Sequence, residues 1–147
     1  MVITHTEVGV REATGHARIS TVLSRAPLGL AAPQVRVEVH LGSWLPAFVM
    51  VGLPEAVVRE SKERVRPALL NSGFEFPSCR ITVNLSPADL PKEGGRFDLP
   101  IAVGILAADG RIPAHALERR EFYGELSLLR RPRWAGCAVC SASRECC

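Results

Sequence analysis

The sequence contains few lysines, few aromatic residues and no long apolar run. Lysine occurs at two of the 147 positions, 62 and 92, and aromatic residues make up 5% of the chain. No apolar stretch reaches the ~18 residues that a membrane-spanning helix requires. The first twenty residues lack the basic and then apolar order of a secretory signal. These absences favour a cytoplasmic globular protein.

A phosphate-binding P-loop is absent as well. That motif needs a glycine-rich loop followed by Lys-Ser or Lys-Thr, so that backbone amides and the lysine hold the phosphates. The glycine pair Gly94-Gly95 is followed by Arg96-Phe97, and no other stretch supplies the motif. We therefore predict no nucleotide cofactor in this chain. The two glycines are interpreted as permitting a tight loop before a helix.

Groups that could act as nucleophiles or metal ligands are also scarce. No serine, threonine or cysteine lies between Ser86 and Ser127, and a Ser86–Lys92 pair would have to form across a proline-containing loop. The four histidines are scattered without ligand spacing. We predict no catalytic residue and no metal site here.

The C-terminal segment, residues 129–147, differs from the rest of the chain in charge and in cysteine content. It holds four arginines, one glutamate and four of the five cysteines. Four cysteines suggest zinc, but Cys137-x-x-Cys140 is separated from Cys146-Cys147 by too few residues for a zinc knuckle. We interpret the segment as a disordered tail.

The remaining residues, 1–128, carry 14 basic and 14 acidic groups, so their net charge is zero. This balance argues against a long basic stripe that would bind DNA electrostatically. Residues 1–18 show no periodicity and are interpreted as an N-terminal extension. The predicted domain therefore spans residues 19–128.

Hydrophobic periodicity within this domain predicts an α/β sandwich. Alternation of apolar and polar residues is strict over 34–41, and the continuous apolar run at 47–53 is typical of a central strand. The predicted strands are 19–25, 34–41, 47–53, 80–85 and 121–128, and the predicted helices are 54–73 and 98–110.

Charged residues on the first predicted helix suggest a surface function. Arg59, Arg64 and Arg66 lie on this helix, and i,i+4 spacing pairs Arg59 with Glu55 or Glu63 and Arg64 with Glu60. The arginines make a nucleic-acid-binding module conceivable, whereas their pairing with glutamates weakens that alternative.

The loop before the second predicted helix holds the candidate site residues Lys92, Gly94, Gly95, Arg96 and Asp98. One interpretation is structural: Arg96 and Asp98 lock the loop through a local ion pair, or Asp98 caps the helix or complements its first turn. The other is that Arg96 is presented to an anion or a protein partner.

Two long motifs, "VGLPEAVVRES" and "NLSPADLPKEGGRFDLPIA", resemble the N-terminal domain of the bacterial magnesium-chelatase-like AAA+ ATPases, the ComM/YifB competence-protein family. The resemblance covers about residues 19–128. It implies the ribosomal S5 domain 2-like fold, a two-layer sandwich of a mixed sheet and two main helices that the proteolytic domain of Lon shares. It also implies an AAA+ ATPase module after this domain, with ATP and magnesium bound there, and a family role in ATP-driven DNA branch migration during natural transformation.

The likeness to Lon bears on the same loop. Lon-type peptidases place a nucleophilic serine where this chain has Gly95-Arg96-Phe97-Asp98, and their lysine follows the last strand, whereas no lysine follows Lys92 here. The resemblance therefore implies the peptidase architecture without its chemistry.

After Leu128 the sequence departs from the family pattern and becomes Arg/Cys-rich. We hypothesise that the chain is a truncated or frameshifted product. The expected function is that of a non-catalytic accessory domain whose partners are the AAA+ module or like subunits, with DNA reached through the family assembly. The alternative is a stand-alone nucleic-acid-binding module of S5-like fold.

Overall fold

The computed structural model describes residues 18–43, 45–128 and 140–141. The predicted N-terminal extension and the Arg/Cys-rich segment lie outside the described residues, apart from Arg18 and the pair 140–141. The hypotheses about disorder and about the C-terminal cysteines therefore concern mainly that undescribed part; within the predicted tail, only residues 140–141 are described, and they form a short strand.

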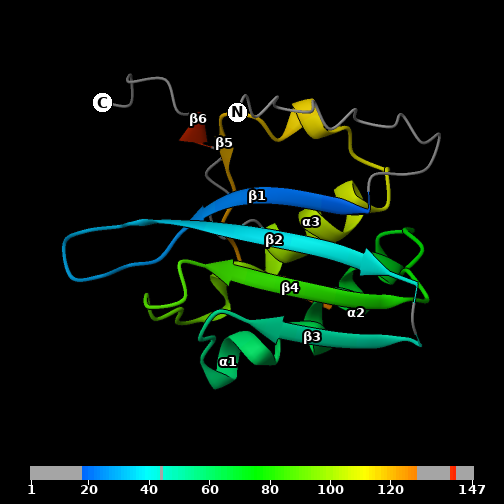
Figure 1. Ribbon diagram of the computed structural model, residues 1–147, viewed down its shortest axis with the longest axis horizontal. Coiled ribbons are helices and arrows are strands. Elements are labelled where there is room, and N and C mark those ends of the chain that lie inside the picture. The colour runs from blue at the N-terminus through cyan, green and yellow to red at the C-terminus, as the bar shows by residue number, and fades with distance from the viewer. Residues whose placement is uncertain (1–17, 44, 129–139, 142–147) are drawn as a thin grey trace, which may run out of the picture.

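Six strands form one mixed sheet in the order β3-β4-β2-β1-β5-β6 (Figure 1). The pairs β1–β2, β2–β4 and β5–β6 are antiparallel, and β3–β4 and β1–β5 are parallel. The strands are β1 (Ile19–Arg25), β2 (Gln34–Gly42), β3 (Ala47–Val51), β4 (Arg80–Ser86), β5 (Arg120–Glu121) and β6 (Cys140–Ser141).

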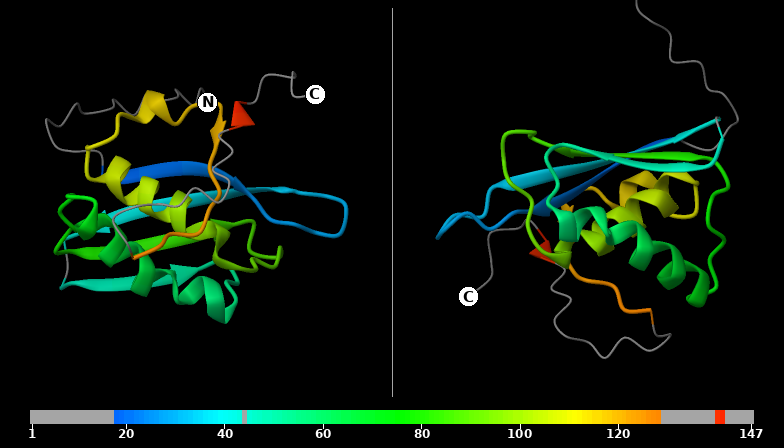
Figure 2. Two further views of the ribbon diagram at one scale, coloured as in Figure 1. Left: turned by 180° about the vertical axis from the view of Figure 1, so that it is seen from behind. Right: turned by 90° about the horizontal axis from the view of Figure 1, so that it is seen from below.

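The helices form a second layer on one face of the sheet (Figure 2). Helix α3 packs against β1 and β2, and α2 packs against α3. The helical elements are α1 (Ala56–Arg59), α2 (Ser61–Asn71), η1 (Gly95–Phe97), α3 (Asp98–Ala108) and η2 (Ala114–Ala116). The predicted two-layer α/β sandwich with two main helices is confirmed.

The core lies between α3 and the central strands. In β2 the alternate residues Val35, Val37, Val39 and Leu41 are buried, because a strand turns successive side chains to opposite faces. Gly104 brings α3 close to this strand: a Cβ atom at that position would lie 2.6 Å from Cγ2 of Val39. Close packing of helix on sheet therefore depends on a residue without a side chain at this contact.

Three details of the prediction are wrong. The apolar run at 47–53 is not central, because β3 lies at the end of the sheet order, where Val51 is 44% exposed. The helix predicted over 54–73 is two helices that meet at Glu60. The strand predicted over 121–128 ends at Glu121, because the amide of Gly124 bonds to the loop before α3 instead of to β1.

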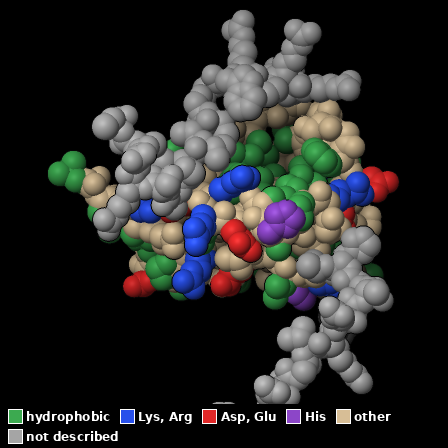
Figure 3. All heavy atoms as spheres, turned by 90° about the horizontal axis from the view of Figure 1, so that it is seen from above, with side chains coloured by type: hydrophobic (Ala, Val, Ile, Leu, Met, Phe, Trp, Pro, Cys, Tyr) green, Lys and Arg blue, Asp and Glu red, His purple; other side chains and the backbone are tan. Residues whose placement is uncertain are grey.

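No helix in the described ranges is long and apolar enough to cross a membrane. The space-filling view from above shows basic side chains lying beside acidic ones on that face (Figure 3). Opposite charges are therefore interspersed on this face.

Candidate functional site

The candidate site is the connection between β4 and α3, residues 87–97. It leaves the sheet after Ser86, passes through Gly94-Gly95 and η1, and delivers Asp98 into the first turn of α3. The segment after β5 runs alongside it, since Gly124 N donates to the carbonyl of Arg96 at 2.8 Å. The site therefore combines two parts of the chain that are separated in sequence.

Lys92 is fully buried on the inner side of this loop. Its Nζ donates to the carbonyl oxygen of Pro87, and its own carbonyl accepts from Glu55 N at 3.2 Å. Burial lowers the pKa of Lys92, and the nearby charge of Asp89 opposes that shift. The side chain thus ties the loop to itself and its backbone ties the loop to the start of α1; it is not displayed to solvent.

The two glycines serve different geometric purposes. Gly94 has φ 74°, in the region that side chains disfavour, and it turns the chain into η1. Gly95 lies under Glu125: a Cβ at Gly95 would lie 2.8 Å from Cδ and 2.9 Å from Cγ of that residue. A carboxylate therefore occupies the space above the glycine pair, where a bound phosphate would meet a negative charge.

Asp98 pairs with Arg64 of α2, and not with its neighbour Arg96. Nε and one terminal nitrogen of Arg64 donate to the two carboxylate oxygens at 2.6 and 3.0 Å, and Leu126 N donates to the carboxylate at 3.2 Å. The Asp98 side chain is fully buried and that of Arg64 is 20% exposed. Hydrogen bonding to Asp98 raises the pKa of Arg64, with burial opposing the shift and Glu125 adding to it.

The local ion pair predicted between Arg96 and Asp98 is therefore replaced by a tertiary one. Asp98 lies in the first turn of α3, as one of the sequence interpretations had it, but it makes no side-chain capping bond. Arg96 is exposed, and its side chain has no ion pair within the described residues. Of the five candidate residues, Arg96 is the one whose charged group faces solvent.

An amide at the start of α3 is already hydrogen-bonded within the chain. Leu99 N, in the first turn, donates to the carbonyl of Gly124 at 3.0 Å. Phe97 is fully buried at the position where the Lon likeness implies a serine. Helix N-termini bind phosphates through unpaired amides, but here the chain itself supplies the acceptor. The arrangement closes the loop and offers no nucleophile.

The arginines on the first predicted helix do not form a free basic patch. Arg64 is held by Asp98 and lies 3.8 Å from Glu60, so the predicted Glu60–Arg64 pair is present. Arg59 donates to the carbonyl of Pro54 at 3.1 Å, and neither of its predicted ion pairs occurs. Arg66 lies over the ring of Phe76, 5.4 Å from its centroid.

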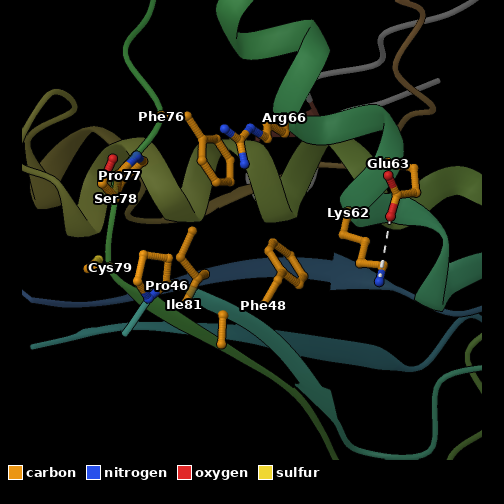
Figure 4. A pocket seen from close by; sticks show the side chains of 11 residues that line it. Pro46, Phe48, Lys62, Glu63, Arg66, Phe76, Pro77, Ser78, Cys79 and Ile81 are labelled. Carbon is orange, nitrogen blue, oxygen red and sulfur yellow. Dashed lines mark ion pairs between the residues drawn. The ribbon is translucent and has the colours of Figure 1, made fainter. Parts of the chain in front are cut away.

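A pocket of about 340 Å³ lies between α2 and the edge of the sheet, away from the loop (Figure 4). Sequence patterns did not indicate it, because its walls come from β3, α2 and the segment before β4. Its floor is apolar, and an exposed ion pair of 3.5 Å between Lys62 and Glu63 lies on its rim. The large apolar side chains that line it are Phe48, Phe76 and Ile81.

The described residues contain no cluster of three or more His, Cys, Asp or Glu side chains that could hold a metal ion. Cys79, which partly lines the same pocket, is a free thiol. The charged groups of the candidate loop that the structure describes are thus engaged mainly in ion pairs and hydrogen bonds within the chain.

Comparison with known proteins identifies a family and several relatives. A family model described as "Subunit ChlI of Mg-chelatase" matches residues 37–144. This chain is 51% identical over 125 residues to the protein YifB of Escherichia coli (strain K12), and 52% identical over 125 residues to YifB of Salmonella typhimurium. Each alignment covers 85% of this chain and 25% of the relative. Competence protein ComM of Haemophilus influenzae is 57% identical over 110 residues, which is 75% of this chain and 22% of ComM.

The chain therefore spans about a quarter of the length of these curated relatives. The family match covers most of the domain, including the loop before α3 and the strands on either side of it. This chain belongs to the family described as subunit ChlI of Mg-chelatase, with relatives that include YifB and ComM.

Proposed function

We propose that this chain acts as a non-catalytic accessory domain within the YifB/ComM group. One observation carries the proposal: the glycine-rich loop and the start of α3 are filled by the chain's own groups. Glu125 covers Gly95, the carbonyl of Gly124 accepts a hydrogen bond from the Leu99 amide, and Arg64 neutralises Asp98. A domain built in this way stabilises a scaffold and leaves bond-breaking chemistry to another part of a larger assembly.

In such an assembly the partner is an AAA+ ATPase module, or like subunits, and that module holds ATP and magnesium. The relatives are about four times as long as the region they share with this chain, which leaves room for one. The name of the ComM relative, a competence protein, supports a role for the assembly in handling DNA, and we propose ATP-driven branch migration as that role. The domain then contributes to assembly or guides the DNA.

A stand-alone nucleic-acid-binding role is the weaker candidate. It needs a continuous basic surface, because phosphate contacts dominate affinity for nucleic acids. Arg64 is neutralised by Asp98 and Arg59 is engaged by a backbone carbonyl. The distribution of charge therefore supports the accessory role.

ATP turnover by the purified full chain tests the proposal. We expect no hydrolysis and no binding of ATP with magnesium at millimolar concentration, measured by phosphate release and calorimetry. An Arg96→Ala variant is the control, because activity that persists unchanged in it comes from a contaminating ATPase or from another site. Turnover that the variant abolishes would show that the loop is catalytic and would overturn the proposal.

A further inference from the structure

The outer edge of β3 is unpaired among the described residues. β3 is the last strand in the sheet order and its ladder partner is β4 alone. Figure 1 shows it as the lowest strand, and the right view of Figure 2 looks towards this edge. Alternate backbone N–H and C=O groups of Ala47–Val51 therefore point away from the sheet.

This edge lacks the features by which proteins prevent edge-to-edge pairing. Edge strands are commonly protected by lysine, proline, a bulge or very short length. The sequence of β3 is AFVMV, with no charge, proline or glycine, and its pairing with β4 runs without a bulge. The leucines that flank the strand beyond Pro46 and Gly52 are exposed as well, Leu45 at 86% and Leu53 at 60%.

We propose that this edge is a self-association surface, at which β3 pairs antiparallel with β3 of a second copy of the chain. The inference concerns the chain itself and is independent of the proposed accessory role. A two-fold axis through Val49 places Phe48 opposite Met50 of the partner and Ala47 opposite Val51 of the partner. Every residue of β3 then faces an apolar residue on the same side of the joined sheet, which is the pairing that stabilises antiparallel strands.

The helix side of the edge is compatible with the same symmetry. A two-fold interface requires a patch that is complementary to itself. Lys62 and Glu63 extend from α2 beside the pocket, 52% and 74% exposed, and together with Arg66, which lies over Phe76, they place charges of both signs near the edge (Figure 4). Each can meet the opposite charge of the second copy, whereas a patch of one sign would repel itself.

The floor of the pocket adds apolar side chains to this surface. Phe48 lies both on β3 and in the pocket wall, beside its cross-strand neighbour Ile81 and opposite Phe76 (Figure 4). Because Met50 of the second copy lies opposite Phe48 in the proposed register, association buries apolar surface on this side as well. Backbone hydrogen bonds and buried apolar surface supply the affinity, and the side-chain pairing selects the register.

Sedimentation velocity of the full chain, from 1 to 100 μM, tests the proposal. The buffer must contain a phosphine reductant, because five cysteines could otherwise link copies covalently. We expect a reversible monomer–dimer equilibrium within this range. We expect Val49→Lys to weaken dimerisation at least tenfold, because the two-fold axis places the two added cations opposite each other. A chain that remains monomeric at 100 μM overturns the proposal.

Two further variants make the result specific. Ile19→Lys is the matched control: Ile19 is 67% exposed and lies in the same cross-strand row as Val49, but three strands away. It adds the same charge to the same face, and we expect dimerisation to be unchanged. Val51→Lys replaces Val49→Lys should the latter fail to fold by circular dichroism. Equal weakening by Ile19→Lys, or a dimer that persists in a folded β3 variant, overturns the proposal.

Hydrogen exchange locates the contact. When the protein concentration is raised from 1 to 100 μM, we expect the outward-facing amides within residues 47–51 to exchange more slowly than they do at 1 μM. A dimer that forms without this protection associates through another surface and also overturns the proposal. The edge could instead pair with a segment from another part of a longer relative. In that case this chain would stay monomeric, which overturns the proposal.

Discussion

Removal of Arg64 is predicted to destabilise the protein more than any other charge removal on α2. The side chain neutralises Asp98, which is fully buried and keeps Leu126 N as its other hydrogen-bond donor. Removing one partner of a buried ion pair costs about 3–5 kcal/mol, because the other charge is left without compensation. We therefore expect Arg64→Met to lower the free energy of unfolding by that amount.

The opposite substitution should cost less. In Asp98→Asn the remaining Arg64 is 20% exposed, lies 3.8 Å from Glu60 and keeps a polar acceptor at position 98. We expect a loss of about 1–3 kcal/mol, the range for hydrogen bonds to charged groups. The double variant should cost less than the sum of the single ones, with a coupling of about 0.5–3 kcal/mol.

Urea denaturation followed by circular dichroism at pH 7 measures these values. Arg66→Met is the matched control on the same helix, where the cation lies over Phe76 and its loss is expected to cost about 0.5–1 kcal/mol. If Arg64→Met costs no more than the control, or less than Asp98→Asn, the explanation from an uncompensated buried carboxylate is refuted.

Two other predictions concern the sheet and its contact with α3. Arg25 donates two hydrogen bonds to Glu121 at 2.6 and 2.8 Å and lowers the pKa of that carboxyl. The interaction therefore stabilises the fold fully at pH values above the ordinary pKa of 4.5, and this stabilisation is lost as the pH falls through the lowered pKa of the folded state. Glu121→Gln should therefore cost about 1–3 kcal/mol at pH 7, and the gap to the unsubstituted chain should narrow in acid; a gap that is constant between pH 7 and 3 would contradict this. Gly104→Ala should cost about 1–3 kcal/mol in thermal or urea unfolding, despite the better helix propensity of alanine, because the new methyl group would lie 2.6 Å from Val39; an unchanged midpoint would show that α3 shifts freely.

Much of the candidate site was recognisable from the sequence, but its internal contacts were not. Glycines before an apolar helix predict a tight loop, and the absence of Ser, Thr and Cys from it is visible directly. The partner of Asp98 is 34 positions away at Arg64. Sequence spacing alone favours the neighbour Arg96, since nothing local distinguishes the two arginines.

The position of a strand within the sheet shows the same limit. Alternation over residues 34–41 predicted β2 correctly, because burial of every second side chain is a local consequence of strand geometry. The apolar run of β3 predicted a strand but not an edge, since a continuous run is compatible with either position. Likewise, 121–128 resembles a strand by composition. The Phe122 amide does bond to Leu23 of β1, but the amides of Gly124 and Leu126 bond to Arg96 and Asp98 instead.

The sequence by itself determined the two-layer α/β class, most of the strand and helix positions, the family and the absence of a nucleophile from the loop. These follow from periodicity and residue identity, which are properties of short segments. Tertiary structure alone decided that Arg64 neutralises Asp98, that Glu125 covers Gly95 and that β3 is left at the edge. Those outcomes depend on which distant segments meet when the helices close over the sheet, and no local pattern encodes that choice.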